Sequence, residues 1–156
     1  MKSVPISLTV NGEVVEALVP PRQHLADFLR ETLGLTGTHI GCDTSHCGAC
    51  TVVIEGKAVQ SCDISLAAVA GKRITTIEGI GSADRLHALQ AAFLEEQAAQ
   101  CGYCTSGIIM TAYALLAANA HPTEAEICAA LDGNICRCGT HARILRAIKK
   151  AAAALP

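Results

Sequence analysis

Nine cysteines stand out in this chain of 156 residues, and eight of them fall into two groups. The first group is Cys42, Cys47, Cys50 and Cys62, three of which lie within the stretch GCDTSHCGAC. The second group is Cys101, Cys104, Cys136 and Cys138, in the stretches QCGYC and NICRC. Disulfides are rare in reducing compartments, and an odd count leaves at least one thiol unpaired. Metal ligation is therefore the better explanation for the excess.

The first group has the spacing C-x4-C-x2-C with a distant fourth cysteine, which is typical of plant-type [2Fe–2S] ferredoxins. Two irons bridged by two sulfides need four thiolates. One loop must therefore wrap three sides of the unit and present backbone N–H groups to the sulfurs. We expect Gly41 and Gly48 to supply the positive φ angles and the close approach that this loop needs. Cys62 would close the site from the end of a strand.

A structural zinc site is the alternative, because Cys47 and Cys50 form one C-x2-C pair and His46 could add a ligand. His46 is more simply interpreted as a solvated loop residue. In the second group, the adjacent ligands Cys136 and Cys138 would strain a tetrahedral zinc site. Two close pairs on helical turns instead suit a second [2Fe–2S] cluster. The sequence thus favours iron at both groups.

Alternating apolar residues and turn signals predict strands in the first half of the chain. Asn-Gly is the strongest short signal for a tight hairpin, and glycine after a run of helical periodicity is a common stop. The expected elements are a hairpin over 5–19 turning at Asn11-Gly12, a helix over 22–34 ending at Gly34, a hairpin over 51–59 turning at Glu55-Gly56-Lys57, and a strand over 73–77.

From about residue 82 the apolar spacing becomes helical, and four helices are expected. Their markers are Leu86, Leu89 and Phe93; Ile108, Ile109, Ala112, Leu115 and Leu116; a capping box from Thr123 to Glu126; and Ile144, Leu145 and Ile148. The change of period predicts an α+β chain with domains over 1–79 and 80–156, joined by the linker GIGSAD. The ninth cysteine, Cys128, is expected to be a small buried hydrophobe within the third helix.

Composition excludes several kinds of function. The net charge of −2 offers no basic surplus for nucleic acid. No apolar run reaches the ~18 residues of a membrane span, so we expect no membrane insertion by this chain. The N-terminal stretch MKSVPISLTV has no apolar signal region, which favours a cytoplasmic location. We find no glycine-rich phosphate loop and no Ser/His/Asp arrangement, and therefore assign no catalytic residue.

The motifs THIGCDTSHCGACTV, SC at Ser61-Cys62, TTIEGIG, QCGYCTSG and GNICRCG occur in order over nearly the whole chain. Together they resemble the small iron–sulfur subunit of the molybdenum hydroxylases, which form the xanthine oxidase family. The resemblance implies an N-terminal β-grasp domain followed by a four-helix bundle. It also implies an electron-transfer subunit of an oxidoreductase, with the substrate chemistry on another chain.

The resemblance further implies a role for each cysteine group. The outer cluster would be held by Cys42, Cys47, Cys50 and Cys62, and the inner cluster by Cys101, Cys104, Cys136 and Cys138. Gln100 and Cys138 would lie against a molybdopterin, expected as the cytosine dinucleotide, in a large partner subunit. A flavin-binding subunit or a cytochrome would accept the electrons.

The sequence departs from the family at three places, none of which is an expected ligand. His39 and Ser106 stand where many members have lysine and proline, and CRCGTH replaces C-R-C-T-G-Y. The last variant resembles nicotinate and isoquinoline dehydrogenase subunits, which favours an N-heteroaromatic substrate, with aldehydes next and carbon monoxide lower. The competing hypotheses are a stand-alone ferredoxin-type carrier, which leaves the second cysteine group unexplained, and a zinc-stabilised interaction module.

Overall fold

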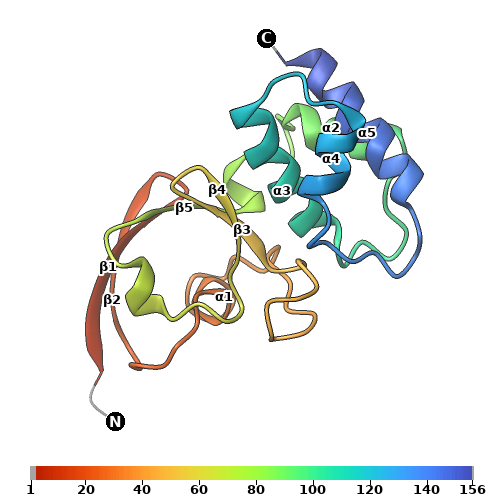
Figure 1. Cartoon of the computed structure of the whole chain (residues 1–156). Coiled ribbons are helices and arrows are strands. Elements are labelled where there is room, and N and C mark those ends of the chain that lie inside the picture. Colours follow the sequence, from red (N-terminus) through yellow and green to blue (C-terminus); the bar gives the residue numbers. More distant parts are fainter. Residues whose placement is uncertain (1–2, 156) are drawn as a thin grey trace.

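The computed structural model describes residues 3–155. The first half of the chain forms a five-stranded mixed sheet, which Figure 1 shows beside the helices of the second half. The strand order is β2-β1-β5-β3-β4, in which β1 and β5 are parallel and the other pairs are antiparallel. The strands are β1 (Val4–Val10), β2 (Glu13–Val19), β3 (Thr51–Ile54), β4 (Lys57–Gln60) and β5 (Arg73–Thr75).

Both predicted hairpins are confirmed, and each turns on two residues with positive φ. Asn11 and Gly12 have φ of 52° and 86°, and Glu55 and Gly56 have φ of 48° and 82°. Positive φ at both central residues is the type I′ geometry that matches the twist of paired strands.

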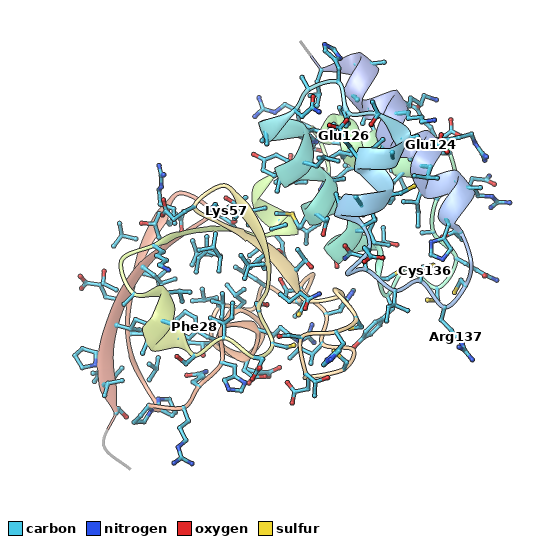
Figure 2. All side chains as sticks on the ribbon, in the orientation of Figure 1. Phe28, Lys57, Glu124, Glu126, Cys136 and Arg137 are labelled. Carbon is cyan, nitrogen blue, oxygen red and sulfur yellow. The ribbon has the colours of Figure 1, made fainter. Side chains whose placement is uncertain are left out.

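The predicted helix over 22–34 is shorter and wider than expected. It consists of α1 (Leu25–Asp27) and a π-helical turn, η1 (Phe28–Thr32), in which the N–H of Leu33 donates to the carbonyl of Phe28. It begins at Leu25 because the N–H of Leu25 donates to the carbonyl oxygen of Ile64, which lies outside the helix. Gly34, with φ of 69°, ends it as predicted. Phe28 is fully buried on the inner side of the sheet (Figure 2).

The strand predicted over 73–77 also ends early, after Thr75. The reason is the Asn11 side chain, which accepts a hydrogen bond from the Thr76 N–H at 2.8 Å and donates to the Thr76 hydroxyl at 3.0 Å. These bonds take Thr76 out of the sheet ladder. A short 3₁₀ turn, η3 (Ile77–Gly79), follows β5, and a similar turn, η2 (Leu66–Val69), precedes it.

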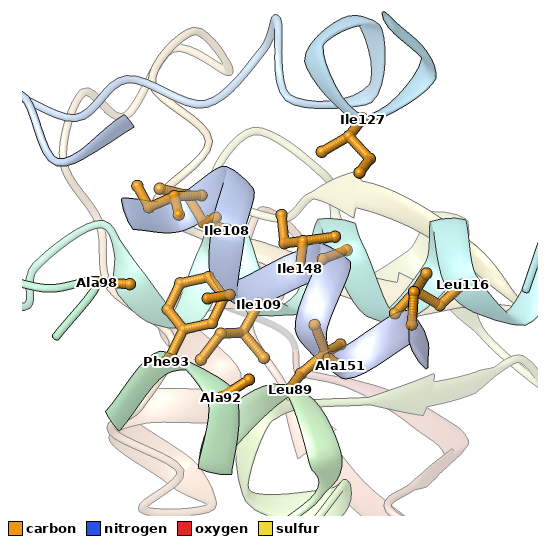
Figure 3. Packing of buried hydrophobic residues seen from close by; sticks show 14 of the residues in the cluster. Leu89, Ala92, Phe93, Ala98, Ile108, Ile109, Leu116, Ile127, Ile148 and Ala151 are labelled. Carbon is orange, nitrogen blue, oxygen red and sulfur yellow. The ribbon is translucent and has the colours of Figure 1, made fainter. Parts of the chain in front are cut away.

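The second half contains four helices, in agreement with the predicted α+β class. They are α2 (Ala88–Glu95), α3 (Thr105–Ala118), α4 (Glu124–Ala130) and α5 (His141–Ala154). Their shared core includes Phe93, Ile108 and Ile148, all nearly inaccessible to solvent (Figure 3). The capping box predicted at Thr123 is present, with Glu126 donating its N–H to the Thr123 hydroxyl and accepting from the Thr123 N–H.

The two halves meet where α3 crosses the loop before β3. Val53 packs on Met110 and Ala114 in a small buried cluster between them. At Gly107 the backbone of α3 lies against the loop, because a Cβ there would be only 2.1 Å from the carbonyl oxygen of Gly48. No helix among residues 3–155 is long and apolar enough to cross a membrane.

We expect Gly107→Ala to destabilise the protein. Alanine is the better helix former by about 1 kcal/mol, but its methyl group must displace the Gly48 carbonyl, and overpacking of this kind costs about 1–3 kcal/mol. Chemical denaturation should show a lower midpoint. Gly133→Ala is the matched control, since its Cβ would approach only the flexible Gln60 amide, at 3.4 Å. Equal midpoints for the two variants would refute the packing constraint.

His87 predicts a dependence of stability on pH. Its Nδ1 caps α2 by accepting from the Leu89 N–H at 3.1 Å, so the cap requires the neutral ring. Burial lowers the pKa of His87 below its ordinary value. The unfolded chain therefore takes up a proton before the folded one, and stability present above about pH 6.5 is lost as the pH falls.

The loss should approach the value of a helix cap, about 1 kcal/mol, between pH 7 and 5. His87→Asn keeps a capping side chain without a titrating ring, so its unfolding free energy should lack this component. The check is the wild-type-minus-variant difference in denaturation midpoint across that pH range; a constant difference would contradict the assignment.

Candidate metal centres

The first cysteine group lies mainly on an irregular loop, residues 36–50, between η1 and β3. Asp43 and Ser45 there have left-handed backbone, with φ of 57° and 52°. Such conformations can turn successive N–H groups to one side, as in anion-binding nests. The N–H groups of His46 and Cys47 both donate to Cys42 Sγ at 3.3 Å. Together with the N–H of Thr44 they lower the pKa of Cys42 to about 6, with the bond from His46 contributing most.

The two glycines singled out in this loop act differently. Gly48 has φ of 72°, and a Cβ on it would lie 2.4 Å from the Gly133 carbonyl, so it supplies both the turn and the close approach. Gly41 is not among the residues with positive φ, so that part of the expectation was wrong. Gly41 instead leaves room for the Cys47 side chain, because a Cβ at position 41 would lie 2.8 Å from Cys47 Sγ.

Cys50 and Cys62 form the buried side of this group. Each is only 1% exposed, and they pack together with Ala26 beneath the loop. The Ser45 N–H donates to Cys62 Sγ at 3.4 Å. Burial raises the pKa of Cys50 to about 11, and the adjacent Cys62 adds to the effect. A bound metal would have to remove this proton, because thiols coordinate as thiolates.

The second group gathers at one end of the helical half. Cys101 and Cys104 precede α3, while Cys136 and Cys138 lie on the segment between α4 and α5, where Figure 2 labels Cys136. Burial raises the pKa of Cys104 to about 12. Burial also acts to raise the pKa of Cys136. Hydrogen bonds outweigh this effect and lower that pKa to about 7; Thr140 contributes most of them, through its hydroxyl and N–H, followed by Cys104 and Cys138.

Three pairs of thiols are in contact. Cys50 contacts Cys62 in the first group, and in the second group Cys101 contacts Cys138 and Cys104 contacts Cys136. Among residues 3–155, no three or more His, Cys, Asp or Glu side chains are arranged to hold a single metal ion. A [2Fe–2S] unit takes its four thiolates as two per iron, so a pairwise set of donors fits such a unit.

Two residues outside the ligand sets can now be placed. His46 is exposed and its Nδ1 lies 3.2 Å from the Thr44 hydroxyl, which agrees with a solvated loop residue. Cys128, expected to be buried, is exposed. The correction follows from helical geometry: Ile127 is the buried residue of α4, and the next position along the helix is turned about 100° away from it.

Gln100 and Cys138 share an open depression of about 460 Å³ at the end of the helices. Gln100 is exposed and Cys138 is half-buried, so both are accessible from outside the chain. Arg143 and Arg146 line the same depression. The two residues expected to meet a partner's cofactor therefore lie on one accessible surface.

The two cysteine groups are linked directly by main-chain and side-chain hydrogen bonds. The N–H of Ile135 donates to the carbonyl of Cys47 at 2.9 Å, and the amide of Asn134 donates to Gly48 at 3.2 Å. The Thr111 hydroxyl in turn donates to Asn134. Sequence reasoning missed Asn134, whose only local signal is its position two residues before Cys136.

Two family models cover most of the chain. A "2Fe-2S iron-sulfur cluster binding domain" matches residues 8–75, and a "[2Fe-2S] binding domain" matches residues 76–149. Each match contains all four cysteines of one group.

Individual relatives cover nearly the full length. A nicotinate dehydrogenase subunit of Pseudomonas putida is 52% identical over 94% of both chains. The alpha subunit of isoquinoline 1-oxidoreductase of Brevundimonas diminuta is 48% identical over 94% of this chain and 97% of its own.

Among solved structures, aldehyde oxidoreductase of Desulfovibrio desulfuricans superposes with a TM-score of 0.93 at 42% identity. The match covers 99% of this chain and 17% of that much longer one. The fold, the two domain matches and the relatives agree with the resemblance found in the sequence. The chain belongs to the small, electron-transferring iron–sulfur subunits of the molybdenum hydroxylase family.

Proposed function

We propose that this chain carries electrons one at a time from the molybdopterin site of a large partner subunit to an external acceptor. The inner [2Fe–2S] cluster would be held by Cys101, Cys104, Cys136 and Cys138, and the outer one by Cys42, Cys47, Cys50 and Cys62. When bound, each cluster supplies a one-electron redox couple. The boundary between the two cluster-binding domains is proposed at residues 79/80.

The observation that carries this proposal is the direct contact between the two cysteine groups. The Ile135 N–H, next to Cys136, donates to the carbonyl of Cys47, so one hydrogen bond joins the two ligand sets. A carrier that used one group alone would not need this contact. The chain itself contributes fixed spacing, and the N–H groups directed at Cys42 and Cys62 are of the kind that tunes cluster potentials.

The inner group is proposed to face the partner. Gln100, Cys101 and Cys138 are accessible, whereas Cys50 and Cys62 are almost wholly covered. Gln100 and Cys138 would contact the pterin, for which the cytosine dinucleotide form is proposed. The long aldehyde oxidoreductase chain, of which this chain matches only a part, supports a large partner.

We propose an N-heteroaromatic compound as the substrate of the complete enzyme, because the named relatives act on nicotinate and isoquinoline. Aldehydes are the second candidate class. The acceptor would be a flavin-binding subunit or a cytochrome. A cytoplasmic location is proposed as well, because cysteines that are to receive clusters must first be kept reduced, and a reducing compartment does this.

Purification of the chain from its native host tests the proposed role. We expect a coloured complex with a large molybdenum-containing subunit, with iron and acid-labile sulfide sufficient for two [2Fe–2S] clusters per chain. A colourless protein would end the cluster assignment and favour zinc. A fully loaded monomer without a partner would favour the stand-alone carrier instead.

Substitution of Cys138 by serine tests the assignment of the second group. Because Cys138 contributes to the inner set alone, Cys138→Ser should lose one of the two EPR signals of the reduced complex, together with turnover, and keep the other signal. Cys128→Ser is the matched control, since Cys128 is exposed and lies outside both sets. Loss of both signals in Cys138→Ser, or of either in the control, would contradict two independent sites.

A further inference from the structure

Tyr103 bridges the two cysteine groups in a way that the proposed function does not require. It lies between Cys101 and Cys104, and its side chain is half-exposed rather than packed in a core. Its hydroxyl donates to the carbonyl of Ile40 at 2.8 Å, two residues before Cys42. The Tyr103 side chain, from the inner segment (residues 101–104), therefore binds the main chain of the outer loop (residues 36–50).

His39 makes the reciprocal contact. Its ring stacks on the ring of Tyr103 with centroids 4.7 Å apart and planes 18° from parallel. Its Nδ1 lies 2.9 Å from the carbonyl oxygen of Tyr103. Because a carbonyl oxygen can only accept, Nδ1 carries the hydrogen and donates it. Each residue thus hydrogen-bonds to the main chain of the other segment, and the two rings fill the space between.

The contact matters because the outer loop has little regular structure of its own. Its C-terminal end is fixed by the bonds from Ile135 to Cys47 and from Asn134 to Gly48. At the N-terminal end, over residues 39–42, two hydrogen bonds join the loop to residues 101–104. In the described part of the chain, both are made by the Tyr103–His39 pair. The loop is consequently held against the inner group at two points, one at each end.

We infer that Tyr103 and His39 are positioning residues that fix the distance and orientation between the two clusters, and so set their electronic coupling. The inference rests on the proposed function, because it requires both cysteine groups to be loaded. Electron tunnelling falls steeply with distance and is helped by hydrogen-bonded contacts. A loop held against the inner group at its C-terminal end only would therefore couple the two clusters more weakly, even with every ligand in place.

Tyr103→Phe in the native complex tests the inference, because it keeps the stacked ring and removes only the hydroxyl bond to Ile40. The complex is reduced with dithionite, and the splitting of the EPR signals by the magnetic interaction between the two reduced clusters is measured. We expect a smaller splitting and broader lines than in the wild type, with iron and sulfide content unchanged. His39→Ala should act in the same direction by removing the stacking and the second hydrogen bond.

Tyr113→Phe is the matched control, since it makes the same chemical change within α3, where Tyr113 contacts His87 instead of a cysteine loop. Its splitting should equal that of the wild type. Unchanged splitting in Tyr103→Phe would overturn the inference, and so would loss of iron, which would make the hydroxyl a requirement for cluster retention. A wild-type complex without two clusters would instead defeat the proposed function itself.

Discussion

The close approach of three backbone segments at Gly48, Gly107 and Gly133 is the constraint on which the rest of this structure depends. A side chain at Gly107 would collide with the Gly48 carbonyl, and one at Gly48 with the Gly133 carbonyl. Bare backbone at Gly48 and Gly107 therefore allows these segments to meet. Each lies within a few residues of cysteines, so the packing of glycines places the thiols of both groups near one another.

From this junction the two hydrophobic cores extend in opposite directions. The sheet encloses Phe28 and Leu29 on one side, and the helices enclose Phe93 and Ile148 on the other. Each core holds its own cysteine loop against the shared boundary. Because the loops are irregular and bear left-handed residues such as Asp43 and Ser45, their shape depends on these cores and on contacts across the junction.

Burial divides the thiols by their ease of ionisation. The pKa is raised at Cys50 and Cys104, where burial penalises the charged form, and lowered at Cys42, where main-chain N–H groups stabilise it. A cluster bound at these thiols, as proposed, would have to overcome the cost at the buried positions. The same burial would then exclude water from the sulfurs, while Gln100 and Cys138 lie accessible at the face proposed for a partner.

Much of the local structure was determined by the sequence alone. Asn11, Gly12 and Gly56 favour tight turns because asparagine and glycine accept positive φ more readily than other residues. Thr123 and Glu126 cap a helix through neighbours in sequence. The spacing of the cysteines pointed to the chemistry for the same reason, since a short loop limits how ligands can be arranged. These features depend on interactions over a few residues, which a pattern can reveal.

Only the tertiary structure decided the features that join distant segments. Several of these were not predicted: the exposure of Cys128, the early end of β5 caused by the Asn11 side chain, and the contacts of Tyr103 with Ile40 and of Ile135 with Cys47. Each depends on how a helix is rotated or on which loop lies beside another. That arrangement follows from the packing of whole faces, and no local pattern of residues encodes it.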